Sequence, residues 1–134
     1  MKRKTALGIV LAVLIIAGYY MLADIPEPLS DELRGSYSCD DAIYSRTMAI
    51  DPDDDNSFYY TDSKNNCRIK GVFEENGENV YSISCGSEAN KAIIPDQSIV
   101  LGDRSFTLTV SGQQLTFKKV HQAPILYGDD NNYR

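Results

Sequence analysis

The stretch Cys67–Cys85, CRIKGVFEENGENVYSISC, decides the fold, because two runs of alternating apolar and polar residues flank its central Glu75-Asn76-Gly77. A three-residue loop with glycine in the left-handed position is a common connection between antiparallel strands. Glu74 and Glu78 then face each other, so apolar residues meet on one face and charged residues on the other. The stretch therefore predicts a β-hairpin.

The same register makes Cys67 and Cys85 a candidate disulfide, because it places them directly opposite each other. Directly paired residues have Cβ atoms about 4.5–5.5 Å apart, slightly beyond the disulfide optimum. Cys39 would then be the odd thiol. Two alternatives stay open, namely that all three cysteines are reduced and buried, or that Cys39 pairs with one of the others.

A second hairpin is predicted from Phe106–Val110 and Gln113–Phe117, which flank Ser111-Gly112. A two-residue turn there places Leu108 opposite Leu115, so that apolar residues again share one face. Further short extended runs, separated by turn residues, are predicted as strands: residues 36–39, 43–50, 57–61, 91–94 and 98–101.

The overall pattern is about eight short strands joined by tight turns with no helical period between them, which predicts an all-β antiparallel meander. We expect closure into an up-and-down barrel rather than a sandwich, because an open meander leaves two bare edges. The interior of such a barrel holds either packed side chains or one small ligand. The side chains expected to line this interior are Tyr37, Phe58, Tyr60, Ile69, Phe73, Tyr81, Ile83, Phe106, Leu108, Leu115 and Phe117.

The two ends of this pattern carry a family resemblance. Leu33-Arg34-Gly35-Ser36-Tyr37 resembles the Gly-x-Trp start of lipocalins, with Tyr37 in place of the tryptophan. Phe117-Lys118-Lys119 is similar to a last strand that closes such a barrel and places a basic residue over the first strand. The layout also resembles short anchored bacterial surface proteins with small lipocalin-like barrels. The resemblance covers roughly residues 33–120 and implies a fold but no functional residue.

A membrane segment is predicted ahead of the barrel. Thr5–Ala23 is nineteen residues without a charge and follows Lys2-Arg3-Lys4. A helix of that length spans roughly 28 Å, close to the hydrocarbon core of a bilayer. Because the positive charge that flanks the segment lies only before it, the segment predicts a single-pass signal-anchor with a cytoplasmic N-terminus.

Two alternatives to the anchor stay open. One is a cleaved signal peptide, although its apolar core exceeds the usual length and a cut after Ala23 would put the bulky Met21 where a small residue is preferred. The other is a buried core helix. Both the anchor and the cleaved signal place the rest of the chain outside the cytoplasm.

The predicted organisation is a basic cytoplasmic region, an anchor, a proline-containing spacer, a β-barrel domain and a polar tail. Their bounds are residues 1–4, 5–23, 24–32, 33–120 and 121–134. The chain carries a formal charge of −6, of which the three N-terminal basic residues contribute +3, so the exterior part carries −9. Such a domain is repelled by nucleic acid and tolerates cationic partners better.

The acidic loop offers one metal candidate. Asp51, Asp53 and Asp55 alternate as in the first half of an EF-hand loop, and Asp62 follows at the spacing of its last ligand. Asn56, however, stands where that loop requires glycine. We therefore expect an ordinary solvated loop, with no bound metal and no cofactor.

Catalytic patterns are weak. The single histidine, His121, lies just before the tail, and the cysteines lack the spacing of a zinc site. We therefore expect no enzyme and no catalytic residue, with a hydrolase as the least favoured reading. The expected role is binding or interaction at the cell membrane with an unknown surface protein. The alternative is a carrier of a small apolar ligand in the barrel interior.

Overall fold

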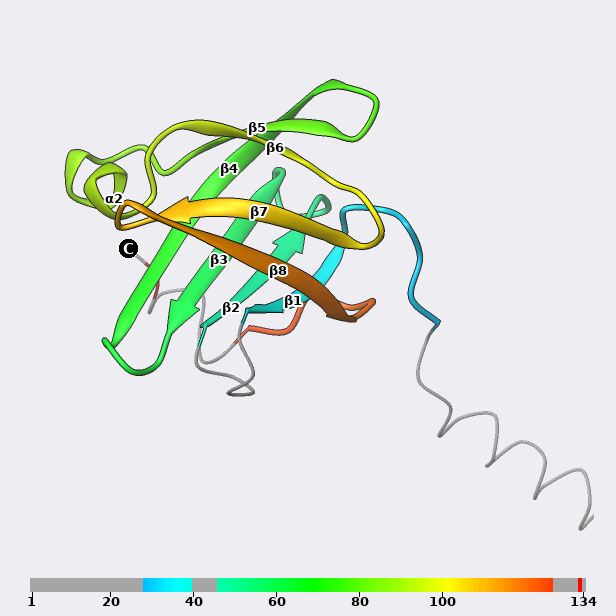
Figure 1. Ribbon diagram of the computed structural model, residues 1–134, viewed down its shortest axis with the longest axis horizontal. Coiled ribbons are helices and arrows are strands. Elements are labelled where there is room, and N and C mark those ends of the chain that lie inside the picture. The colour runs from blue at the N-terminus through cyan, green and yellow to red at the C-terminus, as the bar shows by residue number, and fades with distance from the viewer. Residues whose placement is uncertain (1–27, 40–45, 127–132, 134) are drawn as a thin grey trace, which may run out of the picture.

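A curled sheet of eight antiparallel strands forms the body of the protein (Figure 1). The computed structural model describes residues 28–39, 46–126 and 133 of the chain. The elements are β1 (Gly35–Cys39), β2 (Arg46–Asp51), β3 (Ser57–Asp62), β4 (Cys67–Gly77), β5 (Val80–Ser84), α2 (Glu88–Ile93), β6 (Gln97–Val100), β7 (Ser105–Val110) and β8 (Gln113–His121). The predicted all-β, antiparallel architecture is confirmed.

The strands follow one another around a nearly closed barrel. Their order is β6-β5-β4-β3-β2-β1-β8-β7, so β1 pairs with both β2 and β8. In Figure 1, β7 and β8 cross in front of β3 and β4. A ring contact from Tyr60 of β3 to Phe117 of β8, at 6.5 Å, joins these walls through the core, and Tyr37 of β1 contacts Phe106 of β7 at 4.8 Å. The core therefore lies inside the curled sheet.

The seam between the two end strands, β6 and β7, is bridged by a side chain. The amide nitrogen of Gln97 donates to the Thr109 carbonyl at 3.0 Å, and its amide oxygen accepts from the Thr109 N–H at 2.8 Å. A primary amide offers the same donor and acceptor as a backbone residue. Gln97 thus supplies the pair of hydrogen bonds that a neighbouring strand would supply.

The barrel end beside β1 is closed by the segment before that strand. Lys119 Nζ lies 5.6 Å from the centroid of the Tyr37 ring and donates to the carbonyls of Ser30, at 3.0 Å, and Glu32. Gly35 is required beneath it, because its φ is +153° and a Cβ there would lie 2.7 Å from the His121 carbonyl oxygen. A basic residue of the last strand therefore covers the first strand.

The hairpin that decides the fold is present, but its predicted register is wrong. Phe73 pairs with Ile83 and Glu75 with Tyr81, which moves the partners four residues along β4. The turn lies at residues 78–79, where Asn79 adopts φ +60°, and a bulge between Glu75 and Gly77 absorbs the extra residue. Because the shift is even, each side chain keeps its face, so the apolar pattern fits both registers.

The second hairpin has the predicted register, with Leu108 opposite Leu115. In place of the strand predicted at residues 91–94, residues 91–93 form the last part of helix α2, and Ile94 is its C-cap. Ser87 caps this helix by accepting a hydrogen bond from the Asn90 N–H at 3.2 Å. Ile94, with no exposed surface, buries the end of the helix in the core.

The predicted anchor at residues 5–23 lies outside the described residues, as do residues 1–4, residues 24–27 of the spacer and residues 43–45 of the second predicted strand. Within the described part of the chain, no helix is both long and apolar enough to cross a bilayer.

Candidate binding groove

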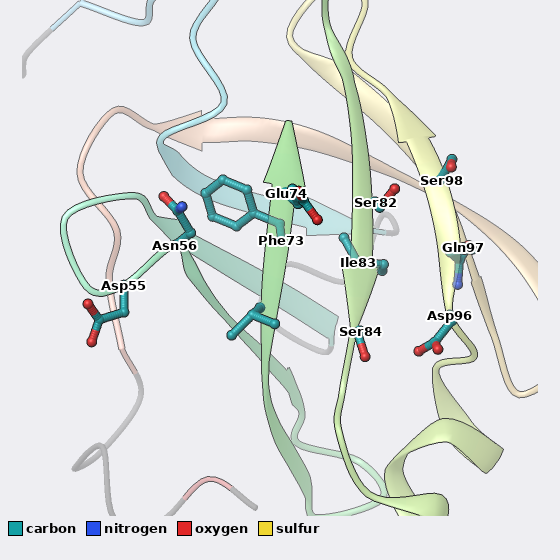
Figure 2. Close-up of a pocket in the computed structure, with 11 residues that line it drawn as sticks. Asp55, Asn56, Phe73, Glu74, Ser82, Ile83, Ser84, Asp96, Gln97 and Ser98 are labelled. Atoms are coloured by element: carbon teal, nitrogen blue, oxygen red, sulfur yellow. The ribbon is translucent and has the colours of Figure 1, made fainter. Parts of the chain in front are cut away.

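A groove of about 680 Å³ runs over the outer face of β4, β5 and β6 (Figure 2). Its lining residues come from these three strands and from the loop between β2 and β3. They are Asp55, Asn56, Val72, Phe73, Glu74, Ser82, Ile83, Ser84, Asp96, Gln97 and Ser98.

The floor of the groove follows from strand alternation. Glu74, Ser82 and Ser98 are paired across the three strands in one outward-facing row. In the next row Val72 pairs with Ser84 and is 52% exposed. Serine side chains are short, so the sheet surface is hollow between the longer residues beside them. The hollow thus offers hydroxyl groups, one carboxylate and an exposed apolar side chain.

The edges of the groove are acidic. Figure 2 shows Asp55 and Asp96 on opposite sides of β4 and β5, with Glu74 between them. No lysine or arginine is among the residues that line the groove. Asp96 also forms an ion pair with Lys91, at 3.5 Å, outside the lining. The groove therefore presents net negative charge and favours a cationic ligand.

The acidic edge is held against the sheet by its backbone. The N–H of Phe73 donates to the Asn56 carbonyl at 2.9 Å. Asp55 and Asn56 adopt φ of 50° and 53°, in the left-handed region that aspartate and asparagine tolerate better than most residues. This loop is therefore fixed against β4, and the position of the Asp55 carboxylate at the groove follows from it.

A second hollow of about 600 Å³ shares Val72 and Ser84 with the groove. It extends toward the start of α2, where Gly86 and Ala89 line it. The two hollows adjoin at the shared residues. The surface over β4 and β5 thus passes from an acidic part to a more apolar part.

The residues predicted to line the barrel interior lie in one cluster. All are buried except Tyr81, which is partly buried and packs against the others. The members of the cluster are Tyr37, Phe58, Tyr60, Ile69, Phe73, Tyr81, Ile83, Phe106, Leu108, Leu115 and Phe117. Burial raises the pKa of Tyr37 well above its ordinary value, so this phenol stays neutral.

The acidic loop does not gather its carboxylates around one point. Asp51 accepts from the Asp53 N–H at 3.1 Å, whereas Asp54 accepts from the Tyr59 hydroxyl. Asp62 ends β3, a strand of six residues that spans about 20 Å, so it cannot join the loop's first carboxylates. Among the described residues, no three histidine, cysteine or acidic side chains are arranged to hold a metal ion.

The three cysteines are thiols in the structure. The observed register places Cys85 level with Gly71 rather than with Cys67. Four residues along a strand correspond to about 13 Å, too far for a disulfide, so the pairing that suggested this bond is absent. Burial, followed by the charge of Asp96, raises the pKa of Cys85 to about 11.

Sequence reasoning did not identify the groove. The sequence indicates only an ordinary solvated face for three serines of the groove, because their spacing shows only that they point away from the core. These are Ser82, Ser84 and Ser98. The one available signal was the run of small residues on the outer face beside Glu74. His121, the only histidine, lies exposed at the end of β8 beside Ser36. It is remote in sequence and pairing from the residues of the groove.

Comparison with family models, with curated proteins and with solved structures gave no match for this chain.

Proposed function

We propose that this chain is a membrane-anchored, extracytoplasmic binding protein whose barrel receives a cationic segment of a partner protein in the groove over β4–β6. The observation that carries the proposal is the lining of the groove. Three carboxylates stand around serine hydroxyls and an exposed valine, with no basic residue among them. Negative charge at a concave surface attracts positive ligands and raises their local concentration.

The proposed role combines this groove with the membrane segment of residues 5–23. That segment keeps the N-terminus in the cytoplasm and holds the barrel outside the cell membrane on the spacer of residues 24–32. A single-pass anchor limits the barrel to partners at or near the membrane surface. The proposed barrel is lipocalin-like, supported by the position of Lys119 over Tyr37. In this proposal the domain binds and does not catalyse.

The groove is a better candidate than the barrel interior. The interior positions hold large rings, and Tyr37, Phe58 and Phe117 have no exposed surface. A small apolar ligand inside the barrel would have to displace such side chains, and overpacking a filled core typically destabilises it by about 1–3 kcal/mol. The carrier hypothesis therefore has less support than partner binding at the outer face.

Binding of a fluorescent oligolysine peptide to the full chain in detergent micelles tests the proposal. Replacing two carboxylates of the groove, Asp55→Asn with Glu74→Gln, should weaken binding roughly threefold to tenfold, because each exposed charge pair contributes up to about 1 kcal/mol. Added salt should weaken binding further, because it screens exposed charges.

The matched control removes the same number of charges outside the groove. Glu75→Gln with Glu78→Gln changes two carboxylates on the same hairpin that do not line the groove. This variant should bind the peptide nearly as well as the wild-type chain. If both double variants weakened peptide binding equally, the affinity would depend only on the net charge of the protein. The groove would then be rejected as the binding site.

A further inference from the structure

The apolar hollow beside the groove continues the groove along β4 and β5. It measures about 600 Å³ and shares Val72 and Ser84 with the groove. Figure 2 shows Ser84 and Glu74 toward opposite ends of the groove. Beyond Ser84 the hollow is lined by Gly86 and Ala89, and a Cβ added at Gly86 would meet nothing within 4 Å. Because the two concave surfaces share their boundary residues, one ligand can lie across both.

The hollow does not attract cations as the groove does. Of the described residues that line it, Lys70 alone carries a positive charge. Its Nζ lies 3.8 Å from Asp54 Oδ2 and 5.2 Å from the centroid of the Tyr59 ring. Tyr133 lines the same hollow, and its hydroxyl is hydrogen-bonded to Thr61 Oγ1 at 2.9 Å. The surface therefore favours a cation over the groove and an apolar group over the hollow.

The separation of these two parts sets the spacing of a ligand that fills both. Glu74 and Val72 lie two positions apart on β4 and face outward, so about 7 Å separates them along the strand. In an extended peptide, side chains two positions apart also lie on one face at about this separation. A basic residue over Glu74 therefore places the residue two positions away over Val72, where the hollow begins.

We infer that the partner segment is extended and amphipathic, with an apolar residue two positions from a basic residue. The basic side chain lies over the carboxylates of the groove, and the apolar side chain lies in the hollow between Val72 and Ala89. The inference rests on the proposed function, because the groove must bind the basic residue. It adds the chemistry of the neighbouring position and so narrows the class of partner sequence.

Two fluorescent peptides of equal charge test the inference: Leu-Gly-Lys-Lys-Lys-Lys-Gly-Leu and the same peptide with serine in place of both leucines. A leucine at each end lets one of them reach the hollow whichever way the peptide runs. The full chain is placed one copy per phosphatidylcholine nanodisc, because neutral lipid does not attract lysine and no detergent can fill the hollow. Empty discs are the blank. The leucine peptide should bind roughly threefold to tenfold more tightly, because removing apolar surface from water is favourable.

One variant blocks the hollow without changing its charge. Ala89→Gln places a longer side chain at an exposed position of α2 and should abolish the gain from leucine, with the serine peptide unaffected. Ala92→Gln is the matched control, because Ala92 is exposed on the same helix but does not line the hollow. The double variant Asp55→Asn with Glu74→Gln should weaken both peptides by the same factor, because the gain from leucine arises outside the groove.

Failure of this inference and failure of the proposed function give different results. If neither peptide depends on the carboxylates of the groove, the proposed function fails and the inference fails with it. If the serine peptide depends on them but leucine gives no gain, or the gain survives Ala89→Gln, only the inference is overturned. A gain lost with two chains per disc would assign the hollow to a second copy, and equally tight binding of N-acetyl-leucinamide alone would assign it to a small apolar ligand. Either result would also overturn the inference.

Discussion

At the scale of single residues, Gly71 shows how closely the core is filled. A Cβ at this position would lie 2.3 Å from Phe58 Cζ and 2.7 Å from the Ser84 carbonyl oxygen. Phe58 has no exposed surface and pairs with Gly71 across β3 and β4, so its ring has no room to move aside. The phenylalanine ring thus occupies the space that a side chain on β4 would take.

We therefore expect Gly71→Ala to lower the free energy of unfolding by about 1–3 kcal/mol, the usual effect of overpacking. For a domain of this size the melting temperature should fall by roughly 4–8 °C per kcal/mol. Thermal unfolding followed by circular dichroism measures it. Gly102→Ala is the control, because nothing lies within 4 Å of a Cβ there. Equal melting temperatures for the two variants would contradict the close contact.

Cys85 is a second residue with a measurable consequence. Its pKa is raised to about 11, so at pH 8 only about a thousandth of the thiol is ionised, and the thiolate is the reactive form. In the folded protein Cys85 should therefore react with iodoacetamide far more slowly than in guanidinium chloride. Peptide mapping after timed alkylation gives both rates. Comparable rates in the two states would show that the thiol is accessible and ionised in the fold.

The raised pKa of Cys85 also makes the stability of the folded protein depend on pH. The unfolded chain ionises this thiol near pH 9.0, whereas the folded chain keeps the proton up to about pH 11. The unfolded state therefore binds fewer protons in this window, and the contribution of Cys85 to stability is lost as the pH rises from 9 to 11. Below pH 9 the contribution is fully present.

At the scale of elements, the seam between β6 and β7 depends on Gln97. Replacing Gln97 by methionine keeps the length of the side chain but removes both hydrogen bonds to Thr109. We expect a loss of about 1–3 kcal/mol in stability and faster hydrogen exchange at the Thr109 amide, because both backbone groups lose their partners. Gln114→Met on the exposed face of β8 is the control. Unchanged exchange at Thr109 would refute the bridging role.

The elements also show where sequence reasoning succeeds and where it stops. The turn Ser111-Gly112 fixes its hairpin, because both residues adopt the positive φ that a two-residue turn needs. In the first hairpin Asn79 adopts the left-handed conformation that was expected of Gly77. The bulge between Glu75 and Gly77 accommodates the extra residue of β4. Apolar alternation is unchanged by an even shift, so only the three-dimensional packing distinguishes the two registers.

At the scale of the whole molecule, the sequence predicts the barrel but not the groove over β4–β6. Alternation identifies core positions such as Tyr60 and outer positions such as Ser82. The groove depends on which outer residues become neighbours across β4, β5 and β6, and that follows from the register. Helix α2 was missed as well, because the apolar residues of its segment also fit a strand. The groove therefore requires the folded arrangement.

The orientation of the whole chain gives the last prediction. Lys2, Arg3 and Lys4 precede the uncharged segment, whereas no lysine or arginine follows it before Arg34, so we expect the barrel outside the cell membrane. Protease added to intact cells should remove residues 24–134 and leave the N-terminal segment in the membrane. A cytoplasmic protein in the same cells is the control for intact membranes. Digestion of the barrel only after lysis would reverse the orientation, and release of an intact barrel beginning near Asp24 would show that the segment is a cleaved signal.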